Sequence, residues 1–344
     1  DYANLVPTQW PTNDHRFFAD GQFYHPDGKA KMIAVTAPKV AKTRFHLNTG
    51  RNRDQWHTMS RTGKSARLGP HLAEPYVEMH PQDAQALKVE AGDLVEVESL
   101  YGKAILRALV TPRVAAGQLF APMHWTRQLT TSGAVNSLTA PVTDPFSGQP
   151  ALKAGAVSAR VYKAKWYGFV ASAQKMTPQT PYAAIARTQA GWQAEVAGRK
   201  RPDDWIAEAR MLSGQAAGEA SVHEDATTGL VRVAIQVDGI NAAVLFAAPH
   251  PVVLSRATAV AAIGTDMSAL AALAGRASAD RPDPGATVCA CFNVGRNTLL
   301  TAVANGAQSV ADMGEATCAG TNCGSCKPEL AALLSKAALP MAAE

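Results

Sequence analysis

Every cysteine of this chain lies between residues 289 and 326, close to the C-terminal end. Cys289 and Cys291 form a C-A-C pair, Cys323 and Cys326 form a C-G-S-C pair, and Cys318 lies just before the second pair. A fold that joins the two pairs directs four sulfurs at one point, and thiolates are ligands of zinc and of iron–sulfur clusters. The pattern indicates that the C-terminal part of the chain folds around a metal centre.

The spacing within the pairs favours an iron–sulfur cluster. A single residue separates Cys289 from Cys291, whereas paired cysteines of structural zinc sites usually have two or more residues between them. The second pair lies in a loop of small residues, T-C-A-G-T-N-C-G-S-C-K-P, which can direct backbone N–H groups at sulfur. Structural zinc stays open as an alternative. Disulfide bonds are a weaker alternative, because the number of thiols is odd and no signal peptide is visible.

The residues around the cysteines predict helices. Between the pairs, Val294, Leu299 and Val303 recur at helical spacing and Gly306 provides a stop. Pro328, just after the second pair, is typical of a helix start.

This stretch resembles the bacterioferritin-associated-ferredoxin-like (BFD-like) [2Fe–2S] domain from about residue 287 to residue 334. The resemblance implies that Cys289, Cys291, Cys323 and Cys326 ligate the two irons. Cys318 lies outside the motif C-x-C…A-G-T-x-C-G-S-C-x-P. We expect it to be a small buried residue, with a spare ligand as the alternative.

Length and composition bound the remaining possibilities. A chain of 344 residues with 47% hydrophobic residues has room for about two or three domains. The net charge of +5 is dispersed, which disfavours a nucleic-acid partner. No apolar run reaches membrane-spanning length and no leader is visible, so we expect a cytoplasmic protein without a membrane partner. Because the sequence opens at Asp1 in what reads as mid-protein text, we expect the tail of a longer polypeptide.

The first 42 residues read as an N-terminal segment that packs on a neighbour. D-G and P-D-G are turn signals between short aromatic strands. Trp10, Phe17, Phe18 and Phe23 are expected to be packing residues.

Residues 43–165 predict a closed β-barrel. Short apolar strands, among them P-Y-V-E-M-H, L-V-E-V-E-S and A-I-L-R-A-L-V, recur about every ten residues, with one short helix that begins at Pro81. Three polar pieces stand out from this pattern: residues 49–62, the pair His124 and Trp125, and residues 135–153. A glycine beside arginine and threonine lets the backbone approach a pyrophosphate, and a tryptophan can stack on a flat ring. A solvated basic loop is the alternative for residues 49–62.

Together these pieces resemble the C-terminal molybdopterin-dinucleotide-binding domain of the DMSO-reductase superfamily, in its nitrate-reductase branch. The resemblance covers about residues 1–165 and implies a six-stranded double-psi barrel. The cofactor-binding residues that it implies are Thr49, Gly50, Arg51, Trp56, His57, Thr58, His124, Trp125, Asn136 and Lys153.

Residues 166–275 read as a small α+β module without assigned chemistry. We expect amphipathic helices over residues 182–198 and 203–214, a hairpin at Asp238-Gly239, and two further helices. Its hairpin faintly resembles the C-terminal module of flavin-linked pyridine-nucleotide reductases. Residues 276–287 read as a linker and residues 288–344 as the small helical [2Fe–2S] domain.

The order of these parts resembles the C-terminal part of a cytoplasmic assimilatory nitrate reductase, which reduces nitrate to nitrite at Mo-bis(molybdopterin guanine dinucleotide). The resemblance implies two partners, an electron donor protein (a reductase subunit, ferredoxin or flavodoxin) and the N-terminal catalytic part of the same enzyme. That part would hold the [4Fe–4S] cluster and the molybdenum-ligating cysteine, which have no counterpart here, so we expect no catalytic residue in this chain. The alternatives are an electron-transfer or redox-sensing module, and another molybdopterin oxidoreductase such as a formate dehydrogenase.

Overall fold

The computed structural model describes residues 4–8, 16–35, 42–278 and 282–338. The chain divides into two units, Asp1–Ala41 and Lys42–Glu344. The described residues of the first unit form turns around residues 20–21 and 26–28 but no strand, so the expected aromatic strands are wrong. Short strands are unstable without further strands to pair with, and the rings of Phe18 and Phe23 stack instead, with centroids 4.9 Å apart. The expectation for Trp10 falls outside the described residues.

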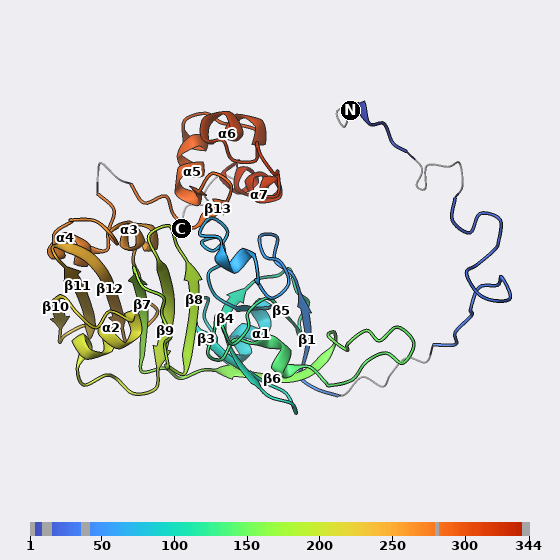
Figure 1. The fold of residues 1–344 in the computed structure, drawn as a ribbon, viewed down its shortest axis with the longest axis horizontal. Helices are drawn as coiled ribbons and strands as arrows, with labels where there is room; N and C mark the ends of the chain where they lie inside the picture. Colours follow the sequence, from blue (N-terminus) through green and yellow to red (C-terminus); the bar gives the residue numbers. More distant parts are fainter. Residues whose placement is uncertain (1–3, 9–15, 36–41, 279–281, 339–344) are drawn as a thin grey trace. The chain divides into compact units, whose positions relative to one another are not determined.

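The second unit begins with a closed six-stranded barrel (Figure 1). Its strands are β1 (Phe45–Gly50), β2 (Tyr76–Met79), β3 (Leu94–Glu98), β4 (Lys103–Val110), β5 (Gln118–Pro122) and β6 (Gly155–Val161). They pair in the order β1-β5-β2-β4-β3-β6, and the antiparallel pair of β6 with β1 closes the ring. The pairs β1–β5 and β2–β4 are parallel. The expected closed barrel is confirmed, and its double-psi description stays a prediction.

Alternating side chains fill this barrel, as the period of a strand requires. In β1, Phe45 and Leu47 are buried in the core and His46 and Asn48 are only half-buried. Helix α1 (Pro81–Leu87) begins at Pro81 as expected, and the 3₁₀ turns η2 (Thr62–Lys64) and η3 (Val135–Leu138) lie in the connecting loops.

A six-stranded antiparallel sheet follows the barrel. Its strands are β7 (Trp166–Ser172), β8 (Tyr182–Arg187), β9 (Trp192–Gly198), β10 (Glu219–Asp225), β11 (Leu230–Val237) and β12 (Ile240–Ala248), in the order β10-β11-β12-β7-β9-β8. Helix α2 (Trp205–Ser213) packs on one face, and α3 (Arg256–Ala261) and α4 (Ala269–Ala274) pack on the other. The expected hairpin at Asp238-Gly239 joins β11 to β12, and both turn residues have positive φ.

The helix expected over residues 182–198 is wrong, because this segment forms β8 and β9. Nearly every residue of both strands is buried, so the alternation that marks a half-buried strand is missing. The alanine content then favours a helix locally, but pairing of β9 with β7 and β8 overrides that preference.

The barrel and the sheet share a buried contact. Leu94 and Ile105 from the barrel pack with Tyr182 and Ala197 from the sheet in one apolar cluster. Beside it, the Arg107 guanidinium donates to both carboxylate oxygens of Glu74 over 2.9–3.1 Å. The barrel and the sheet are therefore joined by packing and by a buried charge network.

The C-terminal part is small and mostly helical, as expected. It contains the hairpin strands β13 (Thr287–Cys289) and β14 (Val294–Gly295), followed by α5 (Arg296–Ala304), α6 (Val310–Thr317) and α7 (Lys327–Ala338). Helix α6 was not expected from the sequence; Ser309 begins it with a capping box that includes Asp312. Leu299, Met313 and Leu330 form the core of this part together with buried cysteines.

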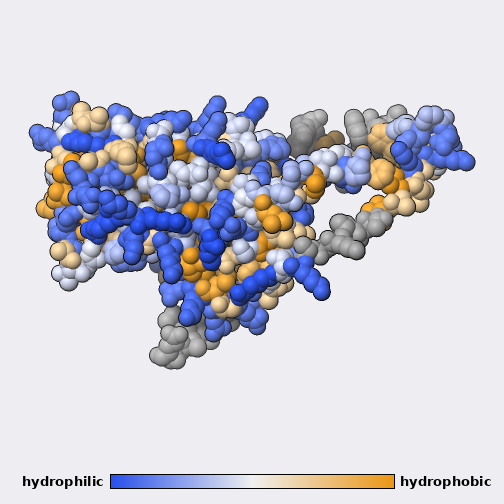
Figure 2. All heavy atoms as spheres, turned by 90° about the horizontal axis from the view of Figure 1, so that it is seen from below, coloured by the Kyte–Doolittle hydropathy of each residue, from blue (hydrophilic) through white to orange (hydrophobic). Residues whose placement is uncertain are grey.

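Hydrophilic residues cover most of the face shown in Figure 2, where hydrophobic residues are visible in small groups. Among the described residues, no helix combines the length and the hydropathy needed to cross a membrane.

Candidate functional site

The two cysteine pairs converge. Cys289 ends β13 and Cys291 lies in the turn that follows, while Cys323 and Cys326 lie in the loop before α7. The Sγ atoms of Cys291 and Cys323 are 3.3 Å apart. Cys289 and Cys326 are both buried and belong to the same core cluster. The site therefore has an inner pair and an outer pair of sulfurs.

Cys323 of the outer pair and Cys326 of the inner pair differ in their electrostatic surroundings. The hydroxyl and backbone N–H of Ser325 and the Cys291 thiol lower the pKa of Cys323, which lies at the surface. Burial and the neighbouring Cys289 thiol raise the pKa of Cys326 to about 11. Thiols bind metal as thiolates, so filling this site releases protons, and the Cys326 thiol, with its raised pKa, holds its proton more strongly than the Cys323 thiol.

The arrangement of donors fits a two-iron cluster. Within the described part of the chain, no three His, Cys, Asp or Glu side chains are arranged to bind a single ion. Instead, Cys291 and Cys323 are in contact near the surface, and Cys289 and Cys326 lie together in the buried core cluster. A mononuclear zinc site needs four ligands around one point, whereas a [2Fe–2S] cluster distributes four thiolates over two metals.

Cys318 is exposed, so the expectation of a small buried residue is wrong. It is the C-cap of α6 and has left-handed backbone geometry, with φ 65°, and its N–H donates to the Gly314 carbonyl oxygen. A helix end of this kind lies at the surface, which a sequence motif does not reveal.

The residues expected to bind the dinucleotide come from four segments at one end of the barrel. Gly50, which ends β1, pairs with Pro122, which ends the parallel strand β5. Strand β6 runs antiparallel to β1, so Lys153 precedes β6 at the same end. The hairpin between β3 and β4 also lies there, because Glu98 pairs with both Lys103 and Ser158. The order of the strands thus gathers pieces that are about a hundred residues apart.

Two contacts tie the end of β1 to the segment before β6. The Thr49 hydroxyl donates to the Leu152 carbonyl oxygen over 2.9 Å, and the Lys153 ammonium donates to the Thr49 carbonyl oxygen. Thr49 is buried while Lys153 is exposed, so the lysine reaches over the strand end from the solvent side.

His124 is buried and orders the loop after β1. Its Nε2 accepts from the backbone N–H of Asn52 over 2.8 Å, and its Nδ1 lies 2.6 Å from the His57 carbonyl oxygen. Because Nε2 accepts, the proton is on Nδ1 and the ring is neutral. Burial lowers the pKa of His124, consistent with this state. Trp125 beside it is also buried, so direct contact of either residue with a cofactor stays a prediction.

The tip of this loop is an exposed stacking surface. Trp56 is 51% exposed. The Arg51 guanidinium lies over its ring at 5.6 Å from the centroid, and the His57 ring meets it edge-on at 4.2 Å. Thr58 is exposed beside them. His57 has a φ of 44°, an uncommon backbone conformation that concentrates at functional sites.

Asn136 is less closely connected. It is exposed on η3, which contacts the start of β4, and thus belongs to the same end of the barrel. Among the described residues, no hydrogen bond joins its side chain to residues 49–58.

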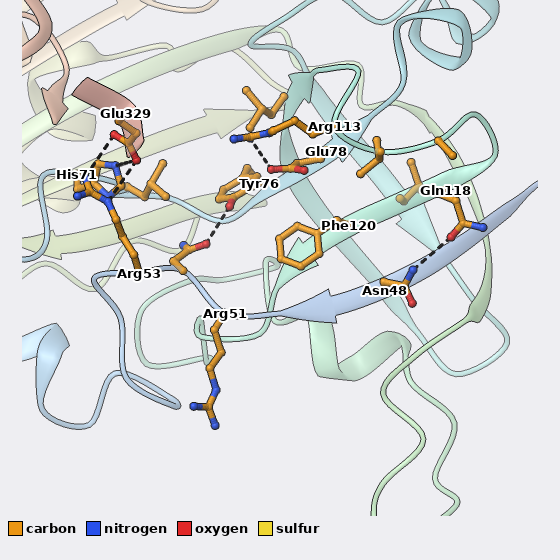
Figure 3. A pocket seen from close by; sticks show the side chains of 16 residues that line it. Asn48, Arg51, Arg53, His71, Tyr76, Glu78, Arg113, Gln118, Phe120 and Glu329 are labelled. Atoms are coloured by element: carbon orange, nitrogen blue, oxygen red, sulfur yellow. Dashed lines mark hydrogen bonds and ion pairs between the residues drawn. The ribbon is translucent and has the colours of Figure 1, made fainter. Parts of the chain in front are cut away.

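A groove of about 790 Å³ runs along the outside of the barrel beside this loop (Figure 3). Outward side chains of β1, β5 and β2 line it, among them Asn48, Phe120 and Tyr76. The Tyr76 hydroxyl donates to the Asn52 side chain over 2.8 Å, and Arg51 points away from Arg53. Arg53, His71 and Glu329 meet at one end of the groove, and none of them was expected from the sequence. They come from three separate segments of the chain. Of the three, only Arg53, in the R-N-R-D run, lies in a segment that the sequence marked as a candidate binding loop.

Two family profiles match the chain. Residues 45–156 match the molybdopterin dinucleotide binding domain, and residues 287–336 match the BFD-like [2Fe-2S] binding domain. Both expected domains and their cofactors, molybdopterin dinucleotide and [2Fe–2S], are confirmed. The exact boundaries at residues 42, 165, 275 and 287 stay predictions.

The chain is also similar to curated oxidoreductases. It is 34% identical over 356 residues to a nitrate reductase of Klebsiella oxytoca, covering 96% of this chain and 39% of that protein. It is 32% identical over 158 residues to an assimilatory nitrate reductase catalytic subunit of Bacillus subtilis, and this match covers 43% of this chain and 22% of that protein. It is 34% identical over 140 residues to a putative formate dehydrogenase of Bacillus subtilis, and this match covers 40% of this chain and 14% of that protein. The chain thus spans about two fifths or less of the relatives that it matches.

Proposed function

We propose that this chain, a homologue of nitrate reductases with a molybdopterin-dinucleotide-binding domain and a BFD-like [2Fe–2S] domain, is the C-terminal part of a molybdenum-dependent assimilatory nitrate reductase. The proposed reaction converts nitrate, two protons and two electrons into nitrite and water. The observation that carries the proposal is the juxtaposition of two parts. The converging cysteine pairs belong to a domain that contacts the same loop on which most of the expected dinucleotide residues lie.

The barrel end would bind and orient one dinucleotide arm of the cofactor. Trp56 offers an exposed ring for stacking, and the Arg51 guanidinium beside it suits a pyrophosphate. The buried Thr49 and the overlying Lys153 fix the strand end from which the loop departs. Molybdenum held by the cofactor would supply the oxygen-atom transfer, and the side chains of this chain would position the cofactor without taking part in that step.

The cysteine site would act as an electron relay. Its outer pair, Cys291 and Cys323, is the more accessible side, which suits electron entry from a donor protein such as a reductase subunit, ferredoxin or flavodoxin. The inner pair, Cys289 and Cys326, is shielded by the apolar core. We propose that the N-terminal catalytic part of the same enzyme supplies the [4Fe–4S] cluster and the molybdenum ligand, and that the enzyme works in the cytoplasm.

Formate oxidation is the second candidate, because a putative formate dehydrogenase matches part of the chain. That match covers 40% of the chain, whereas the Klebsiella oxytoca nitrate reductase covers 96%. The wider coverage favours nitrate. A stand-alone electron-transfer or redox-sensing module is the third candidate and predicts an iron–sulfur protein without molybdenum.

The deciding experiment uses the intact gene product. We expect bound molybdenum, guanine nucleotide released on denaturation, and nitrate reduction with reduced methyl viologen. Formate oxidation without nitrate reduction would favour the second candidate, and iron without molybdenum the third.

Trp56→Ala tests the dinucleotide surface in the same preparation. We expect it to lower the guanine nucleotide content, because the stacking surface is lost. Met211→Ala, on α2 with 50% exposure, is the matched control and should leave that content unchanged. Equal nucleotide content in both variants would contradict a role for the loop tip.

A further inference from the structure

Arg53 connects the loop after β1 to the backbone of the cluster domain. Its Nη2 donates to the carbonyl oxygen of Val288, the residue before Cys289, and its Nη1 lies 3.5 Å from the hydroxyl of Ser325, the residue before Cys326. The same guanidinium forms an ion pair with Glu329 on α7, with Nε and Oε1 3.3 Å apart. One side chain thus contacts both segments that carry the inner sulfurs.

The position of Arg53 is fixed from the barrel side. The neighbouring Asn52 is held by His124 through its backbone and by Tyr76 through its side chain. Asp54 and His71 flank the guanidinium, with Asp54 Oδ2 3.6 Å from Arg53 Nε and 2.6 Å from His71 Nδ1. The Arg53 side chain is 18% exposed, so solvent weakens its field less than it would at the surface.

The charge balance around the cluster makes this position relevant to electron transfer. Four thiolates give a [2Fe–2S] cluster a negative charge, and accepting one electron from a donor protein adds another. A fixed positive charge nearby stabilises the reduced form, and arginine remains protonated at all working pH values. Glu329 and Asp54 oppose this effect, because their carboxylates neutralise part of the Arg53 charge.

We propose that Arg53 holds the [2Fe–2S] domain against the dinucleotide loop and makes the cluster easier to reduce. This inference rests on the proposed function in one respect, that the four cysteines hold the cluster. Arg53 is a positioning residue, which acts on the cluster through the Val288 and Ser325 segments and through its charge.

The potential of the cluster in the full chain tests the inference. In Arg53→Gln we expect one-electron reduction to become roughly tenfold less favourable, a shift of about 59 mV to more negative potential. Glu329→Gln leaves Arg53 charged and removes one of its two carboxylate partners, so the cluster potential of this variant should shift to more positive values. A purely structural contact would not give shifts of opposite sign.

Two further variants sharpen the comparison. Arg53→Lys keeps the charge and should retain most of the wild-type potential. Arg113→Gln removes an arginine that lines the same groove but pairs with Glu78, so it should leave the potential unchanged. Amide hydrogen exchange of residues 287–289 should be faster in Arg53→Gln and unaltered in Arg113→Gln, because Arg53 donates to the Val288 carbonyl whereas Arg113 pairs with Glu78.

Iron and sulfide content is measured first on every sample. A wild-type chain without iron and sulfide would overturn the proposed function and this inference together. A wild-type cluster whose potential is the same in Arg53→Gln and Glu329→Gln, or shifts equally in Arg113→Gln, would overturn this inference alone.

Discussion

The backbone N–H of Asn52 donates to Nε2 of His124 over 2.8 Å, and this bond joins the loop after β1 to the end of β5. Nδ1 of the same ring contacts the His57 carbonyl oxygen, so one buried imidazole holds both sides of the loop. The loop that carries Arg51, Arg53 and Trp56 therefore depends on a neutral histidine.

His124→Ala should destabilise the chain by about 2–4 kcal/mol, because it leaves a cavity and two unpaired backbone groups. Burial lowers the pKa of His124 in the folded state. The stability that neutral His124 contributes is therefore present when the pH is above the pKa of the unfolded state, near 6.5. This stability is lost as the pH falls through the lower pKa of the folded state. Denaturant unfolding at about pH 8 and about pH 5 should show the larger difference from wild type at the higher pH. The exposed His223, changed to Ala, should alter stability by less than about 0.5 kcal/mol.

His71 predicts the opposite pH dependence. Burial alone would lower its pKa and the Arg53 charge opposes protonation, but contacts with Asp54 and Glu329 raise the pKa above 6.5. The stability that protonated His71 contributes is therefore complete when the pH is below the pKa of the unfolded state. This stability is lost as the pH rises through the higher pKa of the folded state. His71→Ala should differ more from wild type at about pH 5 than at about pH 8. A larger difference at the higher pH would mean that His71 is buried neutral.

The buried charges between the barrel and the sheet predict that a single substitution strongly lowers the free energy of unfolding. Arg107→Met removes the partner of Glu74, whose carboxylate also accepts from the Tyr182 hydroxyl. An unpaired carboxylate near this buried interface should cost about 3–5 kcal/mol. Lys200→Gln, which breaks an ion pair with Asp203 whose side chains are 84% and 88% exposed, should cost less than about 1 kcal/mol. Similar unfolding midpoints for both variants would contradict this account of the interface.

The sequence was most informative where the chemistry is local. Two short cysteine pairs with small residues around them predicted the cluster site, and turn residues with short strands predicted the barrel. The sheet was harder: residues 182–198 lack the alternation of a half-buried strand because both faces are covered. Cys318 was placed wrongly because a helix end, set by α6, exposes it.

The contact between the domains could not be predicted from spacing. Arg53, His71 and Glu329 are separated by up to 276 residues and meet only after the barrel and the cluster domain have folded. Each is an ordinary polar residue in its own segment. The proximity of the four segments at the barrel end could not be predicted from spacing either. The family motif identified these segments, and the strand order explains why they lie together.

The most direct test of the central claim is analysis of iron and inorganic sulfide in the purified chain and in its cysteine-to-serine variants. We predict two irons and two sulfides per chain. Changing Cys289, Cys291, Cys323 or Cys326 should lower both contents, and Cys318→Ser should leave them unchanged. One zinc per chain without sulfide, or loss of the cluster on changing Cys318 alone, would contradict the account.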